Sequence, residues 1–155
     1  MTERRWFTPL GVRGAFRRLL PGEWLRHHDA VASVYAGFAH RIGWLHTERV
    51  LTPDKHAEMC AALPEWVADD RTVGDVLTRF GSPSVLLGGT NPRYPRTLLY
   101  AADPPRPLLC LHLWNDYDQP VDDGLVLLLA REDASPFGES CWFTPEGRRR
   151  RPTDD

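Results

Sequence analysis

The chain has 155 residues, of which 42% are hydrophobic and 26% charged, and its formal net charge is −2. This composition is enough for one folded domain and excludes a chain that is disordered throughout. No stretch approaches the roughly 18 uncharged apolar residues of a membrane-spanning helix, and the first residues lack the apolar core of a secretory signal. We therefore expect a cytoplasmic protein with no membrane partner.

The cysteines and basic residues narrow the function classes further. Cys60, Cys110 and Cys141 are widely spaced and form no CxxC pair, so we expect reduced thiols that pack as small apolar side chains. All but one of the 19 basic residues are arginines, a skew that indicates a GC-rich genome rather than a nucleic-acid site. A nucleic-acid binder usually carries a basic excess, which is missing here, so no nucleic-acid partner is expected.

The first half of the chain contains helix signals. Thr8-Pro9 caps a first helix that ends at Pro21-Gly22, and residues 29–45 form a second candidate. In that second segment one helical face collects Val31, Val34, Tyr35, Phe38, Ile42 and Leu45, while Ser33, His40 and Arg41 lie away from it. Period-2 alternation in the same residues leaves a strand open as an alternative.

Two later helices have clearer starts. Thr52-Pro53 supplies a hydroxyl cap followed by proline at the first helical position, and that helix ends near Pro64. Thr72 and Asp75 have the spacing of a capping box, and Gly81 ends that helix.

After Pro83 the pattern changes to strands at residues 84–87, 96–101, 107–114, 125–131 and 140–144. Helices followed by strands with short connections predict an α+β domain, with N-terminal helices packed on one face of a four- to five-stranded antiparallel meander sheet. We expect a single domain over residues 1–145 and a flexible charged tail over 146–155. The second sheet face would stay open and would carry some of Tyr100, His112, Trp114 and Trp142.

The sequence contains no recognisable motif for binding a metal ion or a cofactor. His27 and His28 are adjacent and so point in different directions on a helix, and no HExxH frame exists. The acidic loop from Asp116 to Gly124 fails the EF-hand pattern because Pro120 and Val121 occupy positions that need a ligand and a glycine. GxSxG and P-loop motifs are missing as well, so we expect no metal and no cofactor.

The sequence does predict a surface for another protein. A proline-flanked loop presents Arg93 and Tyr94, and two tryptophans, Trp114 and Trp142, lie on predicted strands. The carboxylates of Asp116, Asp118, Asp122 and Asp123 would steer a partner with a basic surface.

One segment resembles known protein-binding domains. Residues 72–84, read as a helix ending in Gly-Ser-Pro-Ser, followed by the strand ending at Leu99-Tyr100, resemble the small lipoprotein of the outer-membrane β-barrel assembly machine and the β-lactamase-inhibitor proteins. In general format the chain also resembles immunity proteins of bacterial polymorphic-toxin systems. The resemblance implies a non-catalytic domain whose sheet binds another protein.

We therefore predict a protein-binding module that acts as an inhibitor or immunity-type regulator. The alternative is a small enzyme in which His112 and either Asp116 or Asp118 act as acid and base. A third hypothesis, nucleic-acid binding through Arg148–Arg151 and the first helix, has the least support.

Overall fold

The computed structural model describes residues 16, 19–21, 28–88, 94–115, 124–133 and 140–152. Within this part of the chain, α3 (His28–Arg41), α4 (Pro53–Trp66) and α5 (Val73–Phe80) come first. Strands β1 (Val85–Leu87), β2 (Arg96–Tyr100), β3 (Leu109–Trp114), β4 (Val126–Glu132) and β5 (Cys141–Phe143) follow, and α6 (Pro145–Arg150) comes last.

The helix starts form as predicted. The Thr52 side chain accepts a hydrogen bond from the Lys55 backbone N–H at the start of α4. At α5 the capping box is complete, because the Thr72 and Asp75 side chains each accept from the other residue's backbone N–H. Residues 28–41 are helical, which decides between the two structures that the sequence leaves open there.

The five strands pair in chain order, β1-β2-β3-β4-β5, and every pair is antiparallel. This confirms the α+β class and the meander. Each strand ends within about two residues of its predicted bounds. The register between β3 and β4 shifts at His112/Leu113, where a bulge inserts an extra residue into β4.

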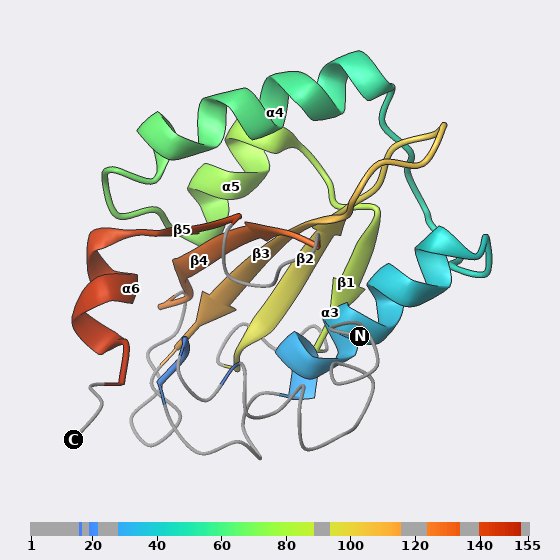
Figure 1. The fold of residues 1–155 in the computed structure, drawn as a ribbon. Coiled ribbons are helices and arrows are strands. Elements are labelled where there is room, and N and C mark those ends of the chain that lie inside the picture. The colour runs from blue at the N-terminus through green and yellow to red at the C-terminus, as the bar shows by residue number, and fades with distance from the viewer. Residues whose placement is uncertain are drawn as a thin grey trace.

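Helices lie on both faces of this sheet (Figure 1). On one face α4 and α5 bury an apolar layer that includes Leu63, Phe80 and Leu111. On the opposite face α3 packs on β1 and β2, and Phe16, Leu19 and Leu20 pack with Leu128 and Leu129 of β4. The expectation of an open second face is therefore wrong for the part of the sheet that these residues cover. The register also splits the expected open-face residues, since Tyr100 and Trp142 lie on the α4 and α5 side and His112 and Trp114 on the α3 side.

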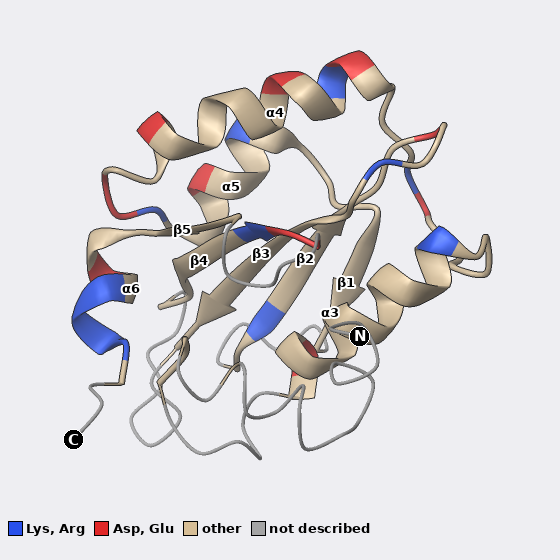
Figure 2. Cartoon of the chain, viewed as in Figure 1, with Lys and Arg blue, Asp and Glu red and all other residues tan. Residues whose placement is uncertain are grey.

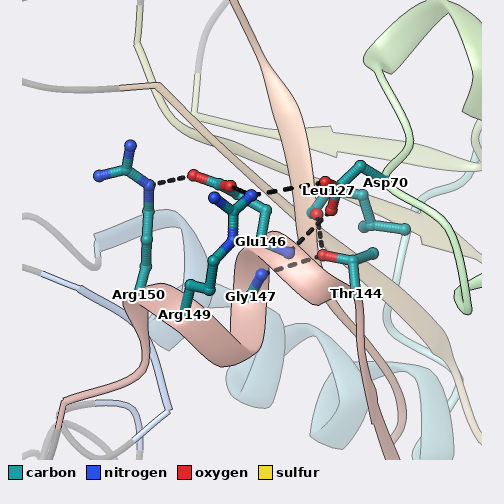
Figure 3. A network of polar contacts seen from close by, with 7 residues as sticks. All are labelled: Asp70, Leu127, Thr144, Glu146, Gly147, Arg149 and Arg150. Carbon is teal, nitrogen blue, oxygen red and sulfur yellow. Dashed lines mark hydrogen bonds and ion pairs between the residues drawn. The ribbon is translucent and has the colours of Figure 1, made fainter.

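The predicted charged tail is a helix over its first residues. Thr144 caps α6, accepting a hydrogen bond from the Gly147 backbone N–H and donating one to the Leu127 carbonyl oxygen (Figure 3). A Cβ at Gly147 would stand 1.9 Å from the Leu128 carbonyl oxygen, so only glycine allows α6 to approach β4 this closely. No helix within the described ranges is long and apolar enough to cross a membrane.

Candidate functional site

Three of the predicted partner residues lie within the part of the chain that the structure describes. Tyr94 is 42% exposed. Trp114 and Trp142 are half-buried: the Arg150 guanidinium lies 4.4 Å from the centre of the Trp114 ring, and Trp142 packs against the core under α4 and α5. Neither tryptophan therefore offers a bare ring. Arg93, Asp116, Asp118, Asp122 and Asp123 lie outside the described residues.

His112 belongs to a buried chain of hydrogen bonds beneath α3. Arginine has donors only, so the Arg131 Nε–H donates to His112 Nε2 at 3.1 Å. In the neutral imidazole the proton is then on Nδ1, which donates to Thr97 Oγ1 at 2.9 Å. The Thr97 hydroxyl donates onward to the Asp29 carboxylate at 2.8 Å. The donors thus run in one direction, from β4 through β3 and β2 to the start of α3.

Arg131 is the hub of this network and is fully buried. Besides its bond to His112, its Nη2 donates to Ser33 Oγ on α3 at 2.5 Å, and its Nη1 pairs with Asp133 at 3.4 Å. Asp133 also pairs with Arg41 at the end of α3. The Phe16 ring covers both the Arg131 guanidinium and the His112 ring, with centres 5.3 Å away in each case. We call Asp29, Ser33, Thr97, His112, Arg131 and Asp133 the inner polar network.

This arrangement does not favour the enzymatic alternative. His112 is 2% exposed, and both of its ring nitrogens already have protein partners. A general base must reach the proton that it abstracts, either directly or through one water. Its two predicted partners, Asp116 and Asp118, lie outside the described residues, so that pairing stays a prediction.

A cysteine–histidine pair occurs on α4. The His56 Nε2–H donates to the Pro107 carbonyl oxygen at 2.9 Å, which leaves Nδ1 to accept from the Cys60 thiol at 3.8 Å. Burial is the largest cause that raises the pKa of Cys60, to about 12, and the neighbouring Glu132 carboxylate adds to it. The thiol therefore stays protonated near neutral pH and lacks the thiolate of a nucleophilic cysteine.

Helix α3 turns half of its predicted apolar face outward. Val34 is buried, and Val31 and Leu45 pack against the core, as predicted. The other buried residues of α3 include the small or polar Ala30, Ser33 and Gly37. Tyr35, Phe38 and Ile42 are 40%, 41% and 41% exposed, so the prediction that they face the core is wrong, as is the prediction that Ser33 faces away from it. The inner polar network explains this orientation, because Asp29 and Ser33 hydrogen-bond inward.

The end of α3 adds a fourth exposed large apolar side chain. Gly43 has φ +77°, its N–H donates to the His40 carbonyl, and the Trp44 N–H donates to the Ala39 carbonyl. These two bonds form a Schellman motif, which reverses the chain directly after the helix. Trp44 is 80% exposed at this turn. We call Tyr35, Phe38, Ile42 and Trp44 the α3 surface.

One sequence signal could have found this orientation. Gly37 lies in the middle of a helix, where glycine costs about 1 kcal/mol relative to alanine. In the structure a Cβ at Gly37 would stand 1.8 Å from an Asp133 carboxylate oxygen. A mid-helix glycine therefore marks the face that meets another element, and Gly37 lies with Ser33 on that face.

The arginines of α6 are largely engaged within the molecule. Arg149 pairs with Asp70 and Glu146, and Arg150 pairs with Glu146 (Figure 3). Asp70 also accepts a hydrogen bond from the Glu146 backbone N–H. Two carboxylates thus offset part of the positive charge that the nucleic-acid hypothesis requires.

Comparisons with protein-family models, with curated proteins and with solved structures find no match. The resemblances noted in the sequence therefore stay expectations. Within the described residues, no group of histidine, cysteine and acidic side chains is arranged to hold a metal ion.

Proposed function

We propose that this chain is a non-catalytic protein-binding module and that it binds its partner through the α3 surface. The observation that carries the proposal is the orientation of α3, in which Tyr35, Phe38 and Ile42 are each about 40% exposed while Ser33 and Gly37 are buried. Exposed apolar groups that cluster on a small protein are typical of interaction sites. The sequence placed the binding surface on the sheet and its loops, and the proposal moves it to α3.

The spacing of the α3 surface suits one mode of recognition. Tyr35, Phe38 and Ile42 stand at positions i, i+3 and i+7, the pattern of helices that insert one face into a hydrophobic groove. Tyrosine, tryptophan and phenylalanine are also enriched at the centres of protein interfaces. Inward hydrogen bonds hold α3 in place. Binding through this helix would therefore cost little conformational entropy.

The charge of this face indicates the chemistry of the partner. Between Asp29 and Arg41 the helix has no acidic residue, lysine or arginine, and both of these end residues bond inward to Thr97 and Asp133. In Figure 2 the coloured segments of α3 lie near its two ends and its middle is tan. The partner that fits is another protein with an uncharged apolar groove.

A second copy of the chain fits less well. With about 200 Å² for a large side chain, the four members of the α3 surface expose roughly 400 Å² together. A stable dimer usually buries about 800 Å² on each partner. A groove that surrounds one helix buries more area on the same side chains than a flat helix pair does.

An inhibitory or immunity-type role remains part of the proposal, with the carboxylates of Asp116, Asp118, Asp122 and Asp123 as an additional contact for a basic partner. Cytoplasmic location belongs to it as well. Cys60, Cys110 and Cys141 are thiols rather than disulfides in the structure, which supports a reducing compartment.

The test uses a matched pair of charge substitutions. Phe38→Glu introduces a carboxylate into the α3 surface, and Leu77→Glu does the same on α5, where Leu77 is 43% exposed. The three chains serve as baits in extracts of the native host, and a protein retained by the wild type and Leu77→Glu is purified. Calorimetry on purified components should then show binding to Phe38→Glu weakened roughly 30-fold or more.

Circular dichroism of both variants should match the wild type, since each substitution is at a half-exposed position. A partner that binds Phe38→Glu as tightly as the wild type contradicts the proposal. A wild-type dimer in sedimentation that Phe38→Glu dissociates would assign the surface to a second copy instead.

A further inference from the structure

The inner polar network contains a histidine, His112 on β3, and histidine is the side chain whose charge ordinarily changes between pH 5 and pH 8. Because side chains alternate along a strand, Thr97 of β2 points toward α3 with His112, whereas Arg96 points toward α4 and α5. His112 therefore lies between the sheet and α3, where its protonation bears on how the helix is held.

The hydrogen bonds of His112 require a neutral imidazole. The Nε atom of Arg131 is always a donor, so His112 Nε2, at 3.1 Å, accepts and carries no proton. The Thr97 hydroxyl gives its own proton to Asp29 and so accepts from His112 Nδ1–H. A single ring proton, on Nδ1, satisfies both contacts.

A second proton on the ring would break the bond from Arg131. It would bind His112 Nε2, so that one N–H would face another and two positive groups would lie 3.1 Å apart. Both side chains are at most 2% exposed, and the Phe16 ring covers both, so little water can solvate the added charge. Burial and a nearby like charge both disfavour the charged form of histidine. The closed network therefore excludes a proton that an exposed imidazole takes up.

Further groups that can carry charge lie near the ring or its partner Arg131, namely Asp29 and Arg41 on α3, Asp133 after β4, and Cys110 on β3. Asp133 pairs with both arginines, and Asp29 meets the ring through the Thr97 hydroxyl. Burial raises the pKa of Cys110 to about 11, so its thiol brings no charge near neutral pH. The charged group in direct contact with His112 Nε2 is thus a cation.

Arg131 connects this histidine to α3. Its Nη2 donates to Ser33 Oγ in the middle of the helix, and its Nη1 pairs with Asp133, which also pairs with Arg41 at the end of α3. A displacement of the Arg131 guanidinium away from a charged His112 acts on both of these contacts. The protonation of one ring is thereby linked to the position of the helix.

We propose that the contacts holding α3 on the sheet form only with neutral His112, so that acid releases the helix and disperses the α3 surface. As α3 opens, His112 Nε2 takes up one proton from solvent and the hydrogen bond from Arg131 Nε is broken. An exposed imidazole gains its proton near pH 6.5. An equilibrium that takes up one proton shifts about tenfold for each pH unit below that value. The consequence for partner binding rests on the proposed function, whereas the release of α3 does not.

The test is amide hydrogen exchange of the free wild-type chain, followed by NMR from about pH 7.5 to about pH 5. At the upper limit the ¹⁵N signals of the His112 ring should show the Nδ1–H tautomer. Protection factors at Val34 and Ala36, which are buried on α3, should fall about 30-fold between pH 6.5 and pH 5. They should stay below those of buried α5 residues, because α3 opens before the whole chain unfolds.

Matched variants separate His112 from the other histidines. His112→Gln keeps an acceptor for Arg131 without titrating, and the fall in α3 protection should shrink to less than about threefold. His28 and His40 lie on α3 itself and titrate in the same range. The double variant His28→Gln/His40→Gln should keep the full fall.

Several results would overturn the inference. Two need no variant to fold: a proton on His112 Nε2 at about pH 7.5, or α3 protection that is constant below pH 6.5 or equal to that of α5 throughout. The others are a full fall in His112→Gln and a fall that is missing in His28→Gln/His40→Gln. None of them bears on Phe38→Glu, which tests the α3 surface itself. A partner that ignores Phe38→Glu likewise leaves the exchange result standing.

Discussion

The two faces of the sheet hold their helices by different means. On the face of α4 and α5, apolar side chains fill the centre, and polar contacts such as the Tyr100 hydroxyl to the Gly81 carbonyl occur at the end of a helix. On the face of α3, Thr97, His112 and Arg131 occupy the centre and bond to the helix or to one another. Directional bonds add to the apolar contacts of Ala30, Val34 and Ala36 in fixing α3, and Tyr35, Phe38 and Ile42 are left partly exposed.

Arg131 and Arg96 show the same difference between the two faces at the level of single residues. Arg131 is buried with an acceptor for Nε, for Nη1 and for Nη2. Arg96 has a buried Nε and Nη2 with none. The first guanidinium is part of the hydrogen-bonded framework, whereas two donors of the second contribute no hydrogen bond among the described residues.

The largest effect should follow from removing the hub of the inner polar network. Arg131→Met keeps the length of the side chain but takes the donors from His112, Ser33 and Asp133. Breaking a buried charged pair costs about 3–5 kcal/mol, and we expect a loss of that size in the free energy of unfolding. Urea denaturation followed by circular dichroism measures it.

Arg96→Met is the matched control, and its free energy of unfolding should equal or exceed that of the wild type, because no hydrogen bond is lost there. Equal losses in the two variants would show that the two arginines do not differ in the way described.

A smaller loss should follow from breaking one link of the network. Thr97→Val keeps the shape of the side chain but removes the hydroxyl that accepts from His112 Nδ1–H and donates to Asp29. We expect unfolding to become about 1–3 kcal/mol easier by urea titration. Thr78→Val on the exposed side of α5 is the control, with a change of about 0.5 kcal/mol at most. Equal effects at the two positions would mean that the Thr97 hydroxyl contributes nothing.

The fold was predictable because its signals are local. Caps such as Thr52 and Thr72 and the leucine-rich runs of β3 and β4 specify helices and strands without knowledge of the rest of the chain. The helical form of Pro145–Arg150 was missed because it depends on close contact with β4 at Gly147, which no local pattern contains.

The candidate site was less predictable for the opposite reason. Apolar periodicity assigned Tyr35, Phe38 and Ile42 to the core, since large apolar faces are usually buried. What the periodicity misses is a partner 98 residues away, Arg131, which bonds to Ser33 and draws that side of α3 inward. In the sequence, Arg131 is a single charged residue at the end of an apolar run. Only the three-dimensional structure shows which acceptors it meets.

The smallest expected effect is the pH dependence of stability, which tests whether His56 on the face of α4 and α5 contributes to it. Burial of His56 on α4 lowers its pKa below 6.5, although its bond to the Pro107 carbonyl acts in the other direction. Between the pKa of the folded state and 6.5, the unfolded chain binds more protons, so stability falls as pH falls through this window and is unaffected by His56 above it. Melting temperatures from about pH 7.5 to about 5.5 should decrease, and less so in His56→Gln, which keeps an N–H for Pro107 without titrating. Exposed His46→Gln should retain the full decrease, and a His56→Gln slope equal to that of the wild type would assign the pH response away from α4.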